Sequence, residues 1–180
     1  GSRLTRFSTG EGAPSTLMTD VALDRAGVVW ATTWDKGIVR IKDGALLPPL
    51  TVATATNGLL EDAFHCLTID PDGVIWFGTM EGLTRHDPRA ARPWITFTET
   101  NGLPDRRAHA VLRDRRGLLW ASTELGLARL EGTSFRTVLR RPRSSGYAWA
   151  LFEDVGGGIW WGDVDGPWRI SGATNELLGG

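Results

Sequence analysis

Hydrophobic and polar residues alternate in short runs separated by glycine-containing turns, and one such run is repeated four times. The clearest copy, D-P-D-G-V-I-W-F-G-T at residues 70–79, combines an Asp-Gly turn with a short apolar strand. The same D-x-x-G-x-x-W pattern ends at Trp30, Trp76, Trp120 and Trp160, at intervals of 46, 44 and 40 residues. A near-constant period in this range predicts a repeat architecture.

Each repeat divides into four short strands joined by turns rich in Gly, Asp and Asn, which close two-stranded hairpins. The first strands are predicted at residues 18–23, 64–69, 108–113 and 147–152. The second strands carry the repeated tryptophans, and the third are predicted at residues 37–41, 82–86, 126–130 and 167–170. Weaker fourth strands are predicted at residues 50–53, 94–97 and 134–138, and no helix of useful length is expected.

The fold class indicated is an all-β propeller of four four-stranded blades, in one domain over residues 1–180. The N-terminal segment 3–8 is predicted to supply the outer strand of the last blade, because Phe7 precedes T-G-E-G much as Phe97 precedes T-E-T-N-G. A competing outer strand lies at residues 175–178. The sequence allows two ways of completing the propeller: the chain forms a closed four-bladed ring, or it forms half of an eight-bladed homodimer. The expected blades cover about residues 17–53, 63–98, 107–139, and 147–171 with 3–8.

The repeated tryptophans are interpreted as packing residues between neighbouring blades. Their recurrence at one position of every blade favours a structural role over a chemical one. A truncation such as Trp76→Ala is therefore expected to cost about 3–5 kcal/mol of stability.

The composition limits the kinds of partner that the chain is expected to bind. The formal net charge of −1 over 180 residues gives no general attraction to nucleic acid. One cysteine forms no internal disulfide, and no Cys/His metal pattern is present. The sequence has no apolar run near 18 residues and no recognisable signal peptide, so no membrane segment is expected.

The repeats resemble those of the two-component regulator propeller family, whose pattern runs F-x-x-x-x-G-L-P, then D-x-x-G-x-x-W-x-G-T, then G-L-x-R. The best match is F-T-E-T-N-G-L-P at residues 97–104, continued by Asp114, Gly117, Trp120 and G-L-A-R at residues 126–129. The resemblance implies the extracytoplasmic sensor portion of bacterial hybrid histidine kinases, a periplasmic or extracellular location, and carbohydrate recognition.

Three features depart from the family pattern. Family propellers have about seven blades in a ring, and this chain has four repeats. It contains no kinase, receiver or membrane segment. The fourth repeat diverges, with Gly162-Asp163 in place of Gly-Thr and Pro167-Trp168 in place of Gly-Leu.

Ligand-binding candidates lie where the repeats differ, in the turns between second and third strands and in the connections between blades. Variation at one rim of a constant scaffold fits either a binding surface or unconstrained loops. The candidates are Trp34, Asp35, Glu81, Glu124, Asp163, Asp165, Arg106, Arg107 and Arg141. Trp34 lies in a turn one residue longer than the others, and its ring would either stack on a sugar or peptide group or pack over the turn. The cluster of Arg140, Arg141 and Arg143 fits either an anionic ligand or a solvated loop.

His65 and His109 occupy the same position on adjacent first strands, which raises a metal or acid–base hypothesis. A zinc site needs a third ligand that the sequence does not supply, so packed or hydrogen-bonded histidines are favoured. No catalytic residue, metal or cofactor is predicted.

Three functions remain open. The favoured one is a non-enzymatic binding or sensing domain for a carbohydrate or peptide, with a possible homodimer formed through the blade seams. The second is a structural or assembly module without a ligand. The third is a metal-dependent lyase similar to the streptogramin lyases, which have related propeller repeats.

Overall fold

The computed structural model describes residues 7, 15, 17–48, 63–141, 150–163, 166–171 and 176–177. Within them the chain forms four antiparallel sheets, each of four strands in sequence order. The sheets are the four predicted blades. One 3₁₀ turn, η2 (Glu99–Asn101), is present in the described part of the chain.

The strand bounds are as follows. Blade 1 contains β1 (Met18–Leu23), β2 (Val29–Thr33), β3 (Ile38–Lys42) and β4 (Ala45–Leu46). Blade 2 contains β5 (Phe64–Ile69), β6 (Ile75–Thr79), β7 (Leu83–His86) and β8 (Trp94–Phe97). Blade 3 contains β9 (Ala108–Arg113), β10 (Leu119–Thr123), β11 (Gly126–Glu131) and β12 (Ser134–Arg140). Blade 4 contains β13 (Ala150–Glu153), β14 (Ile159–Asp163), β15 (Gly166–Ser171) and β16 (Glu176–Leu177).

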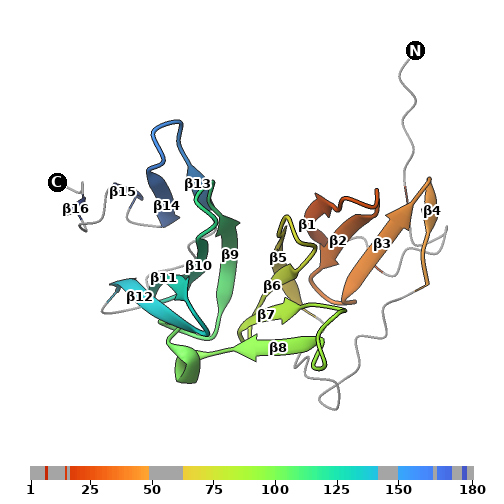
Figure 1. Ribbon diagram of the computed structural model, residues 1–180, viewed down its shortest axis with the longest axis horizontal. Coiled ribbons are helices and arrows are strands. Elements are labelled where there is room, and N and C mark those ends of the chain that lie inside the picture. The colour runs from red at the N-terminus through yellow and green to blue at the C-terminus, as the bar shows by residue number, and fades with distance from the viewer. Residues whose placement is uncertain are drawn as a thin grey trace.

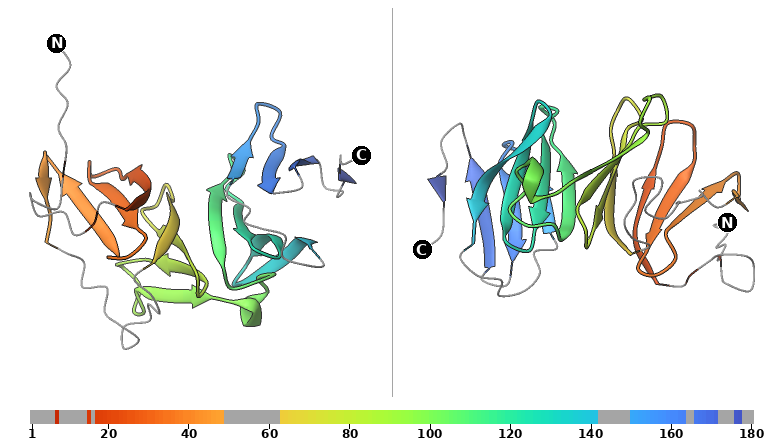
Figure 2. Two further views of the ribbon diagram at one scale, coloured as in Figure 1. Left: turned by 180° about the vertical axis from the view of Figure 1, so that it is seen from behind. Right: turned by 90° about the horizontal axis from the view of Figure 1, so that it is seen from below.

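The blades follow one another along an arc, with blade 1 and blade 4 at its two ends (Figure 1). Both views in Figure 2 show the same succession of sheets. The first strands β1, β5 and β9 are neighbours across successive blades. The predicted all-β propeller architecture is therefore confirmed at the level of four consecutive blades.

The first strands of blades 1 to 3 lie at the residues predicted, and β8 and β12 confirm two outer strands. The outer strand of blade 1 was predicted wrongly. It is β4, which follows a two-residue turn at Asp43 and Gly44, where both residues have positive φ. Such Asp-Gly turns close hairpins tightly, so the fourth strand begins at once. Residues 50–53 lie outside the described residues.

The outer strand of blade 4 is also a correction. It is β16, in the segment considered as the competing choice, and it pairs with β15 through Ile170 and Leu177. Pairing with a nearby segment costs less loop-closure entropy than recruiting the N-terminus. Of the predicted N-terminal strand only Phe7 is described, and it lies against blade 1.

The repeated turn explains why Asp and Trp recur six residues apart. The indole Nε1 of Trp30, Trp76, Trp120 and Trp160 donates to the turn aspartate of its own blade, at 2.8–3.0 Å. In blade 1 the other carboxylate oxygen of Asp24 accepts from the backbone of Ala26 and Val28. One carboxylate thus fixes both the turn and the orientation of the indole, a pairing that the sequence analysis missed.

The basic residue of the third strand completes this unit. The guanidinium groups of Arg40, Arg129 and Arg169 lie 5.5–6.0 Å from the ring centres of Trp30, Trp120 and Trp160. Each arginine is directly opposite its tryptophan in the strand register. A cation over an indole face stabilises the pair.

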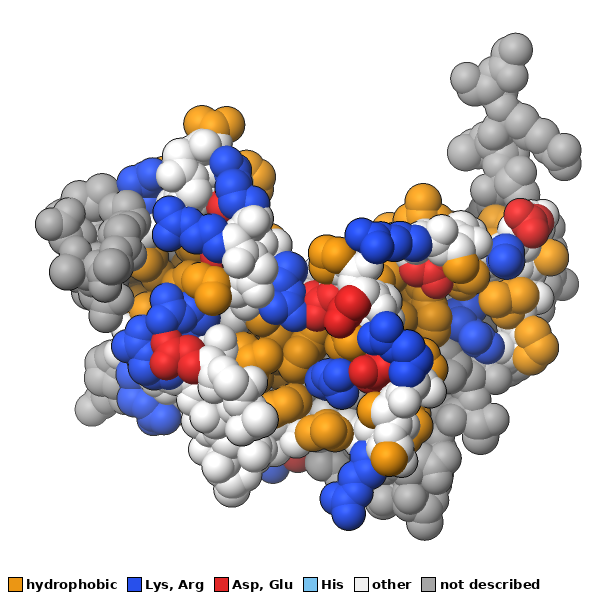
Figure 3. All heavy atoms as spheres, viewed as in Figure 1, with side chains coloured by type: hydrophobic (Ala, Val, Ile, Leu, Met, Phe, Trp, Pro, Cys, Tyr) orange, Lys and Arg blue, Asp and Glu red, His pale blue; other side chains and the backbone are white. Residues whose placement is uncertain are grey.

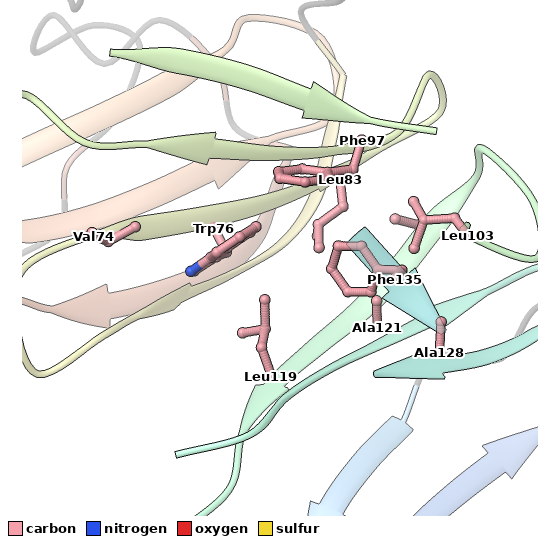
Figure 4. Close-up of a cluster of buried hydrophobic side chains, with 10 residues drawn as sticks. Val74, Trp76, Leu83, Phe97, Leu103, Leu119, Ala121, Ala128 and Phe135 are labelled. Carbon is pink, nitrogen blue, oxygen red and sulfur yellow. The ribbon is translucent and has the colours of Figure 1, made fainter. Parts of the chain in front are cut away.

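The core lies between blades rather than inside one. Between blades 2 and 3, Trp76 and Leu83 pack against Leu119 and Ala121 (Figure 4). Equivalent clusters surround Trp30 between blades 1 and 2 and Trp120 between blades 3 and 4. The predicted packing role of these three tryptophans is confirmed.

Candidate ligand-binding rim

The strand ends define two rims. The turn rim carries the four D-x-x-G turns at residues 24–27, 70–73, 114–117 and 154–157. The variable rim, at the other end of the same hairpins, carries the second-to-third-strand turns and the connections between blades. In blade 1, for example, Leu23 pairs with Val29 beside the D-x-x-G turn, and Met18 pairs with Thr33 at the opposite end.

The variable rim contains a repeated element that supports the turns. The hydroxyl groups of Thr33, Thr79 and Thr123 donate to the carbonyl oxygens of Gly37, Gly82 and Gly126, at 2.9–3.0 Å. Asp163 replaces this threonine in blade 4. Its backbone pairs with Gly166, and Asp165 lies outside the described residues.

Among the described residues of this rim, Trp34 is an exposed aromatic residue, with 42% of its surface accessible. Its ring stacks on His65 at a centroid distance of 4.7 Å and an interplanar angle of 11°. His65 in turn stacks on His109, at 5.0 Å and 5°. Three successive blades therefore contribute to one column of parallel rings. Trp34 packs on a residue of the neighbouring blade and still presents surface to solvent, and its contact with a ligand stays a prediction.

The two histidines are joined by a hydrogen bond between their Nδ1 atoms, at 3.0 Å. The favoured interpretation, that they are packed and hydrogen-bonded, is confirmed. Burial lowers the pKa of His65. Burial, followed by the neighbouring His65 ring, lowers the pKa of His109 to about 4. Both rings are therefore neutral near pH 7, and one Nδ1–H donates to the other nitrogen.

An ion pair borders the column. Arg107, from the connection into blade 3, binds Glu124 at 2.6 Å, and the backbone N–H of Glu124 donates to the Arg107 carbonyl. The Glu124 carboxylate acts on His109 in the direction opposite to burial, favouring its charged form. The Arg107–Glu124 ion pair therefore lies at the blade 3 end of the column of rings.

The remaining predicted residues are placed at the same rim but do not all join the column. Arg106 pairs with Glu81 at 3.1 Å across the blade 2–blade 3 boundary. The Asp35 carboxylate accepts from the hydroxyl of Ser15 at 2.6 Å, a partner that the sequence did not indicate. Arg141 is buried, and its backbone N–H donates to Leu125. The charged candidates at this rim have polar partners, whereas Trp34 carries no charge. Asp35 accepts from a hydroxyl group, and the ion pairs are Glu81 with Arg106 and Glu124 with Arg107.

A metal centre finds no support in the described residues, where no three His, Cys, Asp or Glu side chains come together. Burial, followed by the nearby Asp20, raises the pKa of the Cys66 thiol to about 12. In the metal-free chain Cys66 therefore stays protonated near pH 7.

The four consecutive four-stranded blades, arranged along an arc (Figure 1), define a propeller fold. Residues 58–81 match the family model described as two component regulator propeller, which confirms the predicted resemblance for that segment. A search of curated proteins finds no match to the chain.

Solved structures share the fold. One is the extracellular domain of a protein assigned as the hybrid two-component system BT3049 of B. thetaiotaomicron, with a TM-score of 0.77 and 19% identity; 98% of this chain matches 28% of that one. A second is PorZ, a surface component of the type-IX secretion system of Porphyromonas gingivalis, with a TM-score of 0.68 and 13% identity; 98% of this chain matches 29% of that one.

A third similar structure is virginiamycin B lyase of Staphylococcus aureus, with a TM-score of 0.66 and 20% identity; 91% of this chain matches 55% of the lyase. The chain therefore spans between about a quarter and just over half of these proteins. At such identities the likeness establishes the propeller fold. No helix in the described part of the chain has the length and apolarity needed to span a membrane.

Proposed function

We propose that the chain is a non-enzymatic ligand-binding domain of the sensor type, and that it binds a carbohydrate or peptide group on the variable rim around Trp34. The observation that carries this proposal is the half-exposed Trp34 ring held on the His65–His109 stack. An indole fixed in this way presents a rigid face at low entropic cost on binding. The similar extracellular domain of BT3049 supports a sensor role in a periplasmic or extracellular location.

The lyase alternative has one specific observation in its favour, the similarity to virginiamycin B lyase. The state of the two histidines speaks against acid–base chemistry in this chain. Their Nδ1 atoms are occupied by each other, and burial disfavours the charged form of both rings. A general base must reach a substrate proton and titrate near the working pH. Non-enzymatic binding is therefore preferred.

The test is a thermal-shift screen of oligosaccharides and short peptides at millimolar concentration, followed by calorimetry on any hit. A ligand at 100 times its Kd adds about 2.7 kcal/mol of stability, enough for a shift of several degrees. Trp34→Ala should abolish the shift and Trp34→Phe should retain part of it. Ile95→Ala, which changes an exposed outer-strand residue of blade 2, should leave it intact.

Two results would refute this function. One is the absence of any shift across both ligand classes, which would favour the structural-module alternative. The other is a shift that survives unchanged in Trp34→Ala, which would place the ligand elsewhere. Turnover of a streptogramin-type substrate that is lost in His109→Gln would establish the lyase instead.

A further inference from the structure

The three interfaces between blades are built from the same strand positions. One side is the tryptophan face, formed by the repeated tryptophan and by the residue opposite it on the first strand. In the interface between blades 3 and 4 these residues are Trp120 and Leu112. They pack against Leu151 and Trp161, which face each other on β13 and β14 of the next blade. This second side is the receiving face.

The same pairing recurs in the other two interfaces. Ala22 and Trp30 of blade 1 pack against Leu67 and Phe77 of blade 2. Trp76 of blade 2 packs in one cluster with Val111 and Ala121 of blade 3. Every blade therefore has one tryptophan face and one receiving face, and they always meet in that order along the chain.

At the end of the arc, the tryptophan face of blade 4 is left uncovered. Trp30, Trp76 and Trp120 retain 8%, 2% and 5% of their surface, whereas Trp160 retains 37%. Phe152, directly opposite Trp160 in the register, retains 64%. Large aromatic groups exposed together mark an interaction surface rather than isolated surface residues.

At the other end, the receiving face of blade 1 is left open. Val21 corresponds to Leu67 in register, and 64% of Val21 is exposed against 6% of Leu67. Leu23 beside it is 66% exposed. A hollow of about 430 Å³ lies on this face, and its lining residues are Phe7, Met18, Thr19, Asp20, Val21, Val29, Ala31, Val39 and Ile41.

The hollow coincides with the site that receives a tryptophan elsewhere in the molecule. Its members Val21 and Ala31 are register partners, as are Leu67 and Phe77 beneath Trp30. The lining is largely apolar, as a docking site for an aromatic ring requires. Among the described residues, the surface that carries a matching uncovered tryptophan is blade 4 of the chain itself.

We propose that two copies of this chain join end to end into a closed ring of eight blades. Phe152 and Trp160 of each copy dock on the face around Val21 and Ala31 of the other. Each arc has one face of either kind at its ends, so two copies satisfy both faces at once. The two seams are related by two-fold symmetry, and the assembly closes instead of growing into a filament.

The first test is the solution mass from light scattering coupled to size exclusion, over protein concentrations from micromolar to a few hundred micromolar. A plateau at twice 19.6 kDa is expected. Val21→Arg and Phe152→Asp should each halve the mass while circular dichroism stays unchanged, because both side chains are exposed within one copy. The control Ile95→Asp alters another exposed apolar residue, which lies on an outer strand away from both seam faces and is 40% accessible, and it should leave the mass doubled.

The second test is to mix the two seam variants. In a ring, the mixed dimer has one wild-type seam and one seam in which the arginine at position 21 meets the aspartate at position 152. Each variant alone should remain at 19.6 kDa, and the mixture should recover the doubled mass. A face-to-face dimer of like surfaces would not show this complementation.

Three outcomes would overturn the proposal. A mass of 19.6 kDa at all concentrations would show that the two faces do not bind each other between copies. A doubled mass that persists in both seam variants would place the dimer contact elsewhere. A mass that keeps rising with concentration would indicate open chains of arcs instead of a two-copy ring. None of these readouts requires a ligand, so they are independent of the function proposed for the variable rim.

Discussion

The turn rim and the variable rim use polar groups in opposite ways. At the turn rim the same carboxylate–indole bond is repeated in all four blades, and arginines tie neighbouring blades together. Arg113 of blade 3 forms an ion pair with Asp70 of blade 2, and Arg115 binds Glu153 of blade 4 at 2.9 Å. At the variable rim a threonine–glycine hydrogen bond recurs in blades 1 to 3, but the other side-chain contacts, such as the Trp34 stack, differ from blade to blade.

Figure 3 shows the consequence for the surface, with acidic and basic side chains next to one another in the middle of the face in view. A groove of about 810 Å³ at the turn rim includes Asp70, Arg113 and Glu153, whose charges are already paired. Repetition therefore marks the groups that hold the blades, and variation marks the place where a function can differ from blade to blade.

The largest expected effect follows from truncating a repeated tryptophan. Trp76→Ala should lower the free energy of unfolding by about 3–5 kcal/mol, because it empties a fully packed site and leaves Asp70 without its indole donor. Trp160→Ala at the open end should cost roughly half as much, since part of that ring is already in solvent. Urea denaturation of both variants, at concentrations where the chain is monomeric, measures the difference. Equal losses would contradict the distinction between covered and uncovered tryptophan faces.

Much of the turn rim was predictable from the sequence, because a short stretch of residues specifies each of its hairpins. The D-x-x-G turn and the alternating apolar positions specify each hairpin, so the first strands of three blades were placed correctly. The bond between Asp70 and Trp76 could have been suspected from their constant separation of six residues. The outer strands were harder, since β4 and β16 are two-residue elements with little pattern of their own.

The variable rim was predictable in position but not in detail. The equivalent places of His65 and His109 on adjacent first strands indicated that they would lie close together. The stacking of Trp34 on His65 depends on how blade 1 sits beside blade 2, which no local pattern encodes. The partners of Asp35 and Glu81 come from distant segments, at Ser15 and Arg106, and such long-range polar contacts leave no periodic trace in the sequence.

The second prediction concerns the carboxylate at the centre of the turn rim. Asp70→Asn retains an oxygen for the Trp76 indole but removes the charge that faces Arg113, which is largely shielded from solvent. Breaking a shielded ion pair of this kind should cost roughly 2–4 kcal/mol, measured by urea denaturation. Asp72→Asn is the matched control, because Asp72 lies two residues away in the same turn and is mostly exposed. A loss below about 1 kcal/mol for Asp70→Asn would show that the ion pair with Arg113 adds little to the stability of the chain.

The third prediction is a pH dependence that originates at the variable rim. Burial lowers the pKa of both His65 and His109, the latter to about 4 from an ordinary value of 6.5. The unfolded chain therefore binds more protons than the folded chain between these values, so stability is fully present above pH 6.5 and falls as the pH drops toward 4. Denaturation curves at pH 7, 6, 5 and 4.5 should show this decline.

The control for that pH dependence is the double variant His65→Gln with His109→Gln, which keeps polar side chains but removes the titration. Its stability should change less over the same interval. Burial also lowers the pKa of His86, and Asp24, Asp87 and Glu131 have lowered pKa values, but these groups titrate in both proteins and cancel in the difference. Parallel curves for the two proteins would mean that the histidine pair does not titrate with folding.

The smallest effects are expected from the ion pairs of the variable rim. Glu124→Gln weakens the half-buried pair with Arg107 and should cost about 1 kcal/mol, whereas Glu81→Gln weakens an exposed pair with Arg106 and should cost less than about 0.5 kcal/mol. Urea denaturation at low and high salt measures both, and only the exposed pair should lose its contribution at 1 M salt. Glu124 also favours the charged form of His109, so Glu124→Gln should steepen the loss of stability below pH 6.5. If both variants behaved alike in salt and in acid, the variable rim would be a set of independent surface contacts, and its column of rings would not be electrostatically coupled to the loops around it.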